Sequence, residues 1–250
     1  MRLDHSIVQT YGFSRNKAQQ FIEGGLVSIH GKTITKTSYQ VDGNEEILLR
    51  DEKSVHWVSR SAGKLDGFLN ELKELGHDIL INGKSALDIG SSTGGFTQVL
   101  LEHGIMHVDS VDVGTNQLHE SIKGDPRVTS YERTDIRTFS PTLQLSNQSS
   151  IYDIIVCDVS FISLHEIIPD ILRFSLIHTN IFLLFKPQFE VGKENLRKTG
   201  VPRNGDIVLQ RLQEFEQLLN HNGLIIHKKS PSTVLGEAGN EEWMIWVGRG

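Results

Sequence analysis

An aspartate and a lysine each follow an apolar run that has the composition of a buried strand. Asp158 comes directly after a run that ends at Cys157, and Lys186 comes directly after Ile181–Phe185. The carboxyl ends of neighbouring strands form the ligand crevice of an open α/β sheet, so we expect both side chains beside a pocket. Lysine is rarely buried without a partner, and Asp158 is the expected counter-ion of Lys186. A plain ion pair at the sheet edge is the alternative interpretation.

A glycine-rich turn between a strand and a helix predicts a cofactor site. The segment Ala86–Phe96 contains an apolar strand, the acid Asp88, and a turn with Gly90, Gly94 and Gly95. Glycines at these points remove side chains where the backbone would approach a ligand. Their spacing differs from the G-x-G-x-x-G of dinucleotide sites, so a cofactor without a pyrophosphate fits better. A turn that binds no ligand is the alternative.

Two further acids follow the next strands, where a doubly wound sheet places groups that bind a nucleoside. Asp112 ends the second strand, 24 residues after Asp88, and is expected to bind ribose hydroxyls. Asp135 follows the third strand and is a candidate partner for an adenine amino group. Either acid could instead cap a helix or face solvent.

The elements that position these residues belong to one large domain. From about residue 62 the chain alternates between apolar strands and helical patterns, which predicts a doubly wound α/β fold with a mostly parallel, seven-stranded sheet. The expected strands are 85–89, 108–113, 128–132, 151–156, 181–186, 223–229 and 243–247, and the expected helices are 64–75, 95–103, 164–177 and 206–221.

The N-terminal residues predict a small α+β module. Apolar residues at helical spacing predict one helix that ends near Gly12 and a second that Ser14 caps. A hairpin that turns at His30–Gly31 and a short strand at 47–49 follow. The predicted units are a small domain at 1–53, a linker at 54–62 and a large domain at 63–250.

Charge and composition restrict the partner and the location. The net charge of the chain is −6, yet residues 1–40 hold five basic and two acidic residues, an excess of three positive charges. This asymmetry favours a polyanion as the partner of the small module, although a solvated face is the commoner cause of a small excess. The sequence has a single cysteine, no secretory signal and no apolar run of about 20 residues, so we expect a cytoplasmic protein without a membrane span.

These residues, in this order, resemble a known family over nearly the whole chain. The resemblance is to the TlyA (haemolysin-A-like) group of ribosomal RNA 2′-O-methyltransferases, which combine an FtsJ-type, Rossmann-like catalytic domain with an N-terminal α-L RNA-binding domain. The segments that carry it are 2–4, 14–18, 25–31, 58–60, 87–96, 111–114, 117–118, 125–128, 158–164, 186–190 and 239–240.

The resemblance implies a catalytic set, a cofactor and an RNA-binding surface. The family's Lys-Asp-Lys-Glu set falls on Lys64, Asp158, Lys186 and Glu242, with Glu241 as a neighbouring alternative to the last. Without the resemblance, Lys64 and Glu242 would be taken for surface groups. The implied cofactor is S-adenosyl-L-methionine, with no metal. The residues expected to bind the cofactor are Asp88, Gly90, Ser91, Ser92, Thr93, Gly94, Gly95, Phe96, Asp112, Val113, Asp135 and Ile136. The residues expected to bind RNA are Arg2, Arg15, Lys17, Lys32, Lys36 and Arg60.

The implied reaction is 2′-O-methylation of a cytidine in ribosomal RNA, with the large subunit favoured. Lys186 is expected to orient or deprotonate the hydroxyl group. We expect a monomer that binds ribosomal RNA or ribosomal subunits. Four basic residues after Lys186 either bind the target RNA strand or are simply surface residues of a loop. They are Lys193, Arg197, Lys198 and Arg203.

Three other functions are compatible with parts of the sequence. One is a ribosome-assembly factor that keeps the pocket without turnover, and another is a membrane-lytic haemolysin. The third is a nicotinamide-dependent dehydrogenase. The glycine spacing and the lack of an obvious hydride-site histidine disfavour the dehydrogenase, and the lack of a signal or a strongly cationic amphipathic helix disfavours direct lysis.

Overall fold

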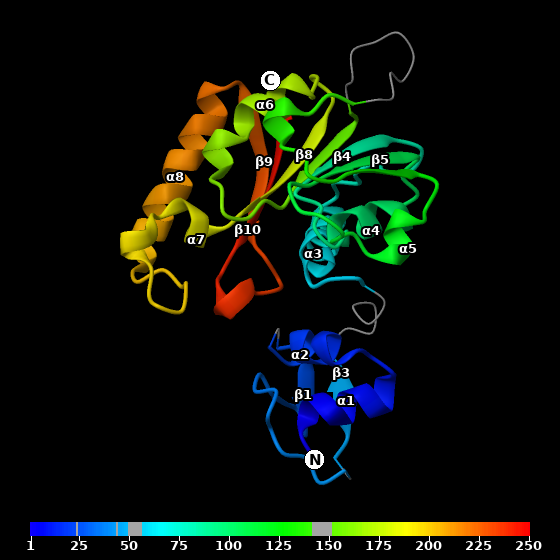
Figure 1. Ribbon diagram of the computed structural model, residues 1–250. Helices are drawn as coiled ribbons and strands as arrows, with labels where there is room; N and C mark the ends of the chain where they lie inside the picture. Colours follow the sequence, from blue (N-terminus) through cyan, green and yellow to red (C-terminus); the bar gives the residue numbers. More distant parts are fainter. Residues whose placement is uncertain (24, 44, 50–56, 142–151) are drawn as a thin grey trace.

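Two β-sheets, each with its own hydrophobic core, organise the chain (Figure 1). The computed structural model describes residues 1–23, 25–43, 45–49, 57–141 and 152–250. The N-terminal residues form a three-stranded sheet with the order β2-β1-β3, and the rest form a seven-stranded sheet with the order β6-β5-β4-β7-β8-β10-β9. The predicted fold, a small α+β module with a larger α/β domain, is confirmed.

The seven-stranded sheet is mostly parallel, as predicted. Its strands are β4 (Ser85–Ile89), β5 (His107–Val111), β6 (Val128–Tyr131), β7 (Ile154–Cys157), β8 (Asn180–Phe185), β9 (Leu224–Pro231) and β10 (Trp243–Arg249). The first five pair in parallel, and β10 runs antiparallel to both β8 and β9. β4 and β7 are buried along their whole length, because helices cover the sheet on both faces.

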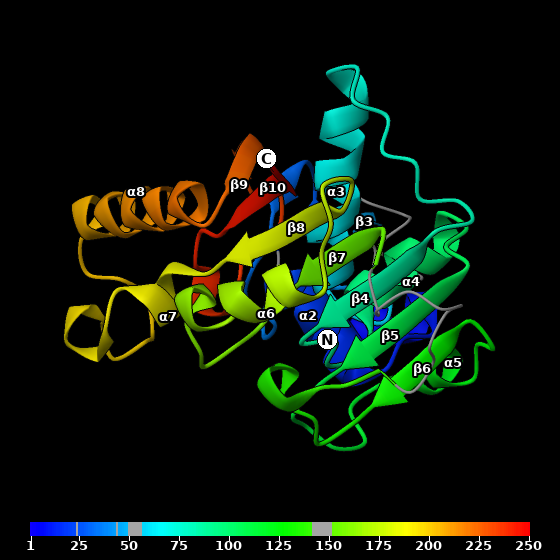
Figure 2. The ribbon, with the colours of Figure 1, turned by 90° about the horizontal axis from the view of Figure 1, so that it is seen from above.

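Helices pack on the two faces of this sheet (Figures 1 and 2). Phe68 of α3 and Phe96 of α4 belong to the core on one face, and Ile171 of α6 and Phe215 of α8 belong to the core on the other. The α-helices are α3 (Ser61–Glu74), α4 (Gly95–Glu102), α5 (Glu120–Lys123), α6 (Ile168–Arg173), α7 (Pro187–Glu190) and α8 (Gly205–His221). Single turns of 3-10 helix are η2 (Ile136–Thr138), η3 (Leu164–Glu166), η4 (Lys193–Asn195) and η5 (Glu237–Gly239).

Prolines explain two differences from the sequence prediction. The helix predicted at 164–177 is wrong, because the chain forms η3 and then the short α6, which has Pro169 in its first turn. Proline lacks the N–H that would continue a preceding helix, so α6 starts anew. The strand predicted to include Lys186 ends one residue earlier, since Pro187 begins α7 directly after it.

The small sheet packs against two helices. Its elements are α1 (Leu3–Tyr11), α2 (Arg15–Glu23), β1 (Val27–Ile29), β2 (Lys32–Thr33) and β3 (Ile47–Leu49). Gly12 ends α1 in the left-handed conformation (φ 70°), and the Ser14 hydroxyl accepts a hydrogen bond from the Lys17 amide at 3.2 Å, as a capping residue does. The hairpin turns at His30 and Gly31, which both have positive φ. These predicted turns are confirmed.

The predicted boundary between the domains falls partly outside the described residues. This applies to residue 53 and to the first three residues of the linker predicted at 54–62. Ser61 and Ala62, the last two residues of that linker, already belong to α3. Among the described residues, no helix is long and apolar enough to cross a membrane.

Candidate active site

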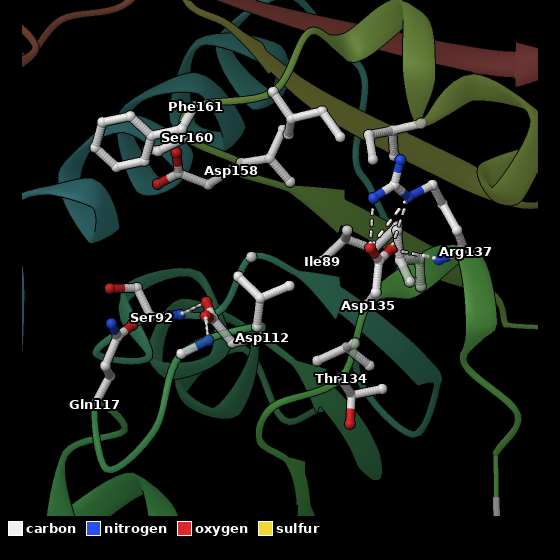
Figure 3. Close-up of a pocket in the computed structure, with 18 residues that line it drawn as sticks. Ile89, Ser92, Asp112, Gln117, Thr134, Asp135, Arg137, Asp158, Ser160 and Phe161 are labelled. Carbon is white, nitrogen blue, oxygen red and sulfur yellow. Dashed lines mark hydrogen bonds and ion pairs between the residues drawn. The ribbon is translucent and has the colours of Figure 1, made fainter.

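A pocket of about 590 Å³ opens where β4, β5, β6 and β7 end (Figure 3). The chain passes from β4 through β5 to β6 on one side and continues through β7 to β8 on the other, so the pocket lies at the switch point of the sheet. Its lining residues are Ile89, Gly90, Ser92, Val111, Asp112, Val113, Gly114, Gln117, Thr134, Asp135, Ile136, Arg137, Asp158, Val159, Ser160, Phe161, Ile162 and Ile167.

The glycine turn contributes to this pocket through part of its length. Gly90 has φ +80°, and a Cβ there would lie 2.8 Å from the Asp158 carbonyl oxygen, so glycine lets the end of β4 approach the end of β7. Gly94 and Gly95 have a different reason for being glycine. A Cβ at Gly94 would lie 2.8 Å from Leu118, and one at Gly95 would meet the Ser59 and Ser61 hydroxyls. Both positions serve packing between protein segments, and neither lines the pocket.

Three other residues of the turn lie away from the pocket lining. Ser91 is buried, Thr93 is half-buried, and Phe96 belongs to the core under α4. Ser92 does line the pocket, and its amide is bonded to an acid of the next strand. Of the residues of this turn that were expected to bind the cofactor, Gly90 and Ser92 line the pocket. The others, which do not line it, are Ser91, Thr93, Gly94, Gly95 and Phe96.

Asp88 is a fully buried acid at the centre of the sheet. Its Oδ2 accepts a hydrogen bond from Thr97 Oγ1 at 2.6 Å, and that hydroxyl also contacts Ser110 Oγ at 2.9 Å. Its Oδ1 is buried and has no hydrogen-bond partner among the described residues. Burial raises the pKa of Asp88 to about 7, the negative charges of Asp158 and Asp112 add to the rise, and the Thr97 bonds oppose it.

The acids that follow β5 and β6, Asp112 and Asp135, accept hydrogen bonds from backbone N–H groups. Asp112 accepts hydrogen bonds from the amides of Ser92 at 2.8 Å and Gly114 at 2.7 Å, which fixes its carboxylate in the pocket wall (Figure 3). Asp135 caps η2 and pairs with Arg137 at 2.6 Å, and this guanidinium lowers the pKa of Asp135. The capping role was an alternative in the sequence interpretation, whereas the Arg137 partner was missed.

Two lysine–carboxylate pairs lie at the next strand ends. Lys186 Nζ is 2.6 Å from Asp158 Oδ1 and donates a hydrogen bond to Ser160 Oγ at 3.0 Å, so the predicted ion pair is confirmed. Lys64 Nζ donates to Glu242 Oε2 at 2.6 Å. Both lysines are almost fully buried, with 9% of Lys186 and 7% of Lys64 exposed.

Glu242, and not Glu241, is the acid that meets Lys64. Glu242 is 2% exposed and also accepts a hydrogen bond from Gln188 Nε2 at 2.9 Å, whereas Glu241 is exposed. The antiparallel register pairs Trp243 with Phe185, so Glu242 lies one step beyond, opposite Lys186. The sheet and α3 together therefore bring the predicted Lys-Asp-Lys-Glu set to the edge of the sheet where β7 and β8 end.

Sequence reasoning missed four residues around this edge. Arg137, Ser160 and Phe161 line the pocket, and Gln188 holds Glu242. Phe161 is 91% exposed and has φ +66°, an unfavourable combination for a large apolar residue. Phe161 and Gln188 lie in segments that carry the family resemblance, which was the available signal, while the Arg137 contact had none.

The small N-terminal module gathers basic residues around a buried acid. Asp4 is fully buried and accepts hydrogen bonds from Arg2 at 2.9 and 3.0 Å, from Arg15 at 3.3 Å and from Gln19 at 3.1 Å. The Arg2 guanidinium, with help from Gln19 and Arg15, holds the pKa of Asp4 well below its usual range. Each arginine keeps further N–H groups that Asp4 does not use.

The remaining predicted RNA-binding residues are distributed over several elements. Lys17 lies 5.2 Å from the centre of the Phe13 ring, and Lys32 and Lys36 are exposed on and after β2. Arg60 is half-buried directly before α3, in the large domain. The basic stretch after Lys186 is exposed at Lys193, Arg197, Lys198 and Arg203.

Comparison with known proteins agrees with this architecture. Residues 57–249 match the family model of FtsJ-like methyltransferases, and residues 1–47 match the S4 domain. The chain is 38% identical to the 23S rRNA (cytidine-2′-O)-methyltransferase TlyA of Campylobacter jejuni, over 98% of both proteins. It is 35% identical to the 16S/23S rRNA (cytidine-2′-O)-methyltransferase TlyA of Mycobacterium tuberculosis, over 94% of this chain and 84% of the relative.

A solved structure is similar over the whole chain. It is that of a Streptococcus thermophilus protein that carries a hemolysin name, with a TM-score of 0.72 and 29% sequence identity. The similarity covers 100% of this chain and 88% of that one. Both the large sheet and the N-terminal module therefore have a counterpart in one known chain.

Proposed function

The chain belongs to the TlyA family, and from this premise we propose that it methylates the ribose 2′-hydroxyl of a cytidine in ribosomal RNA. We propose large-subunit RNA as the substrate, because the Campylobacter relative, matched over 98% of its length, is named as a 23S enzyme. Ribosomal subunits lie in the cytoplasm, so we place the enzyme there. The observation that carries the proposal is the pair of buried lysine–carboxylate contacts beside the switch-point pocket.

S-adenosyl-L-methionine fits the pocket by charge and by hydrogen-bonding capacity. Its sulfonium and ammonium groups are cations, and Asp112 and Asp158 line the pocket while Asp88 lies buried beneath with an unpartnered oxygen. Asp112 would hold the ribose hydroxyls, and Asp135 with Ile136 would lie at the adenine end, as in the general doubly wound plan. When bound, the cofactor supplies an electrophilic methyl group.

Lys186 is the proposed contact of the reacting hydroxyl. Asp158 and Ser160 contact its Nζ, and a protonated lysine would have a further N–H to donate to the 2′-oxygen. A neutral Lys186 would take the hydroxyl proton as a base, and a protonated one would stabilise the oxygen as its negative charge develops. Asp158 orients the amine in both cases.

Lys64 and Glu242 complete the edge as a second buried pair. Glu242 is held from two sides, by Lys64 of α3 and by Gln188, which lies two residues after Lys186. The pair thus ties α3 to the segment that carries Lys186. We propose that it orients the substrate ribose and excludes water from the reacting groups.

The small domain is the proposed grip on folded RNA. Arg2 and Arg15 present guanidinium groups that are partly exposed and held by Asp4, which suits contacts to phosphates. Lys17, Lys32 and the other exposed cations would add contacts that depend on shape and charge more than on base identity. The basic stretch 193–203 would hold the target strand near the active site.

A methyl-transfer assay with Lys186→Ala tests the proposal. Large ribosomal subunits that lack ribose methylation are incubated with the full-length chain and labelled S-adenosylmethionine, and the modified nucleotide is mapped. We expect the variant to lose activity by about 100-fold or more, the size of a lost acid–base group. Lys73→Ala, an exposed lysine in the last turn of α3, is the matched control and should keep full activity. Absence of methyl transfer by the wild-type chain to any ribosomal particle would sink the proposal.

A further inference from the structure

Two segments that follow neighbouring strands run side by side at the active site. Segment 158–164 follows β7, and segment 186–190 follows β8. At their beginnings Lys186 is bound to Asp158 at 2.6 Å and to Ser160 at 3.0 Å. These contacts alone would hold segment 158–164 only near its start.

The same two segments are joined again further along. The ring centroids of Phe161 and Phe189 are 5.3 Å apart. Glu190 Oε2 accepts a hydrogen bond from Ser163 Oγ at 2.5 Å, and Glu190 Oε1 accepts one from the Leu164 amide at 2.8 Å. Both oxygens of one carboxylate thus bind the far end of segment 158–164.

Segment 158–164 belongs to two parts of the site at once. Residues 158–162 line one wall of the pocket (Figure 3). Asp158 also pairs with Lys186, which is not a lining residue. The backbone of Phe161 is in the left-handed region and its side chain is 91% exposed, so contacts on either side of it in segment 158–164 must hold this conformation. A contact that fixes the far end therefore controls both the pocket wall and the partner of Lys186.

Glu190 is placed to make that contact rigid. It ends α7, in which the Phe189 amide bonds to the Lys186 carbonyl at 3.0 Å and the Val191 amide bonds to the Pro187 carbonyl at 3.0 Å. One helical turn therefore sets the separation of Glu190 from Lys186. The bonded partner, Ser163, caps η3 by accepting from the His165 amide at 3.1 Å.

We infer that Glu190 is a positioning residue, which braces segment 158–164 against α7 and thereby sets both the pocket wall and the Asp158–Lys186 contact. The inference rests on the proposed function for its cofactor-affinity and catalytic readouts, whereas hydrogen exchange tests the brace without it. Glu190 touches neither the pocket nor Lys186 directly, so it acts through Ser163 and Leu164.

The test compares three variants of the full-length chain. Glu190→Ala removes both bonds. Glu190→Gln keeps the shape, since its amide oxygen can accept from the Leu164 amide and its NH₂ can donate to Ser163 Oγ. Glu74→Ala removes an exposed glutamate at the end of α3, and it is the matched control.

Three measurements are made on each variant. They are the affinity for S-adenosylhomocysteine, the hydrogen exchange of the amides of residues 159–164, and the kcat and KM of methyl transfer to large ribosomal subunits. For Glu190→Ala we expect affinity about tenfold weaker, exchange about tenfold faster and kcat about tenfold lower. Glu190→Gln should stay within about threefold of wild type in all three measurements, and Glu74→Ala should be unchanged.

The outcomes separate the brace from the proposed function. If the wild-type chain transfers no methyl group, the proposed function fails, and the exchange measurement still decides the brace. Exchange and affinity in Glu190→Ala equal to those of Glu74→Ala would overturn the inference. A lower melting temperature with unchanged cofactor affinity and unchanged KM and kcat per folded molecule would mean that Glu190 serves folding alone, and this result also overturns it.

Discussion

Two ion-pair clusters in this molecule differ in how far their cations are exposed. At the edge of the large sheet the cations are buried, with Lys64 7% and Lys186 9% exposed. In the small domain the carboxylate of Asp4 is fully buried, and the side chains of Arg2 and Arg15 that it holds are 38% and 56% exposed. Pairing thus leaves both partners largely buried at the sheet edge, where Glu242 is 2% exposed, whereas it leaves two arginines facing outward in the small domain.

This difference indicates what each cluster can act on. A buried lysine acts on a group that enters its site, because little water screens its charge there. An exposed guanidinium offers its unused N–H groups to a polyanion that stays outside the protein. The first arrangement suits chemistry on one hydroxyl group, and the second suits the grip on an RNA backbone.

Removal of one buried partner should have the largest effect. Glu242→Ala leaves Lys64 buried without its carboxylate, and we expect a loss of about 3–5 kcal/mol in the free energy of unfolding of the large domain. Tryptophan fluorescence during urea unfolding measures it selectively, since Trp57, Trp243 and Trp246 all lie in that domain.

The adjacent glutamate supplies the control for this change. Glu241→Ala removes an exposed carboxylate of the same type, and its free energy of unfolding should stay within about 0.5 kcal/mol of wild type. Equal losses in the two variants would show that the Lys64–Glu242 pair is not a desolvated contact, and the contrast between the two clusters would disappear.

The next prediction concerns the pH dependence of stability. The folded-state pKa of Asp88 is about 7, above its value of 3.8 in the unfolded chain, so the folded state binds a proton that the unfolded state has lost. Stability from this group is present at low pH and falls as pH rises from about 4 to 7, by at most about 4 kcal/mol.

Asp88→Asn tests directly whether the free energy of unfolding falls with rising pH because of this group. Asparagine keeps the shape and an acceptor for Thr97 but carries no charge, so the difference in unfolding free energy between variant and wild type should shift in favour of the variant as pH rises from 4 to 8. Urea unfolding at each pH measures this difference. If this difference does not change with pH, the folded-state pKa of Asp88 is not raised and the prediction is wrong.

Arg15→Ala tests the cluster of the small domain, whose arginines are exposed. Loss of one phosphate contact should weaken binding to ribosomal RNA about tenfold and lower the slope of log affinity against log salt by about one unit. The kcat of methyl transfer at saturating RNA should not change, because Arg15 lies in the small domain. Filter binding at several salt concentrations measures the slope, and an unchanged slope would contradict a phosphate contact.

The sequence predicted the large sheet and the Asp158–Lys186 pair because both depend on local patterns. Apolar runs specify strands, and parallel strands bring the residues after them to one edge. The pair of Lys64 with Glu242 needed the family resemblance, since 178 residues separate the two and no periodicity connects them.

The contacts that sequence reasoning missed depend on tertiary geometry. The bond between Glu190 and Ser163 exists because β7 and β8 are neighbours and α7 is one turn long, and neither residue type indicates it. Gly94 and Gly95 also show what tertiary structure adds to sequence reasoning. Their glycine character predicted close approach to a ligand, and the folded chain adds that a side chain at either position would meet neighbouring side chains.

The smallest expected effect comes from Lys32→Ala on the hairpin of the small domain. Lys32 is exposed and has no ion pair with a described residue, so its side chain must lose conformational freedom when it meets a phosphate. Arg15, in contrast, is already held by Asp4. We therefore expect Lys32→Ala to weaken RNA binding only about two- to threefold, with the same decrease of about one unit in the salt slope. The same filter-binding series measures it, and a loss equal to that of Arg15→Ala would show that positive charge alone, and not its fixation by a buried acid, determines the grip on RNA.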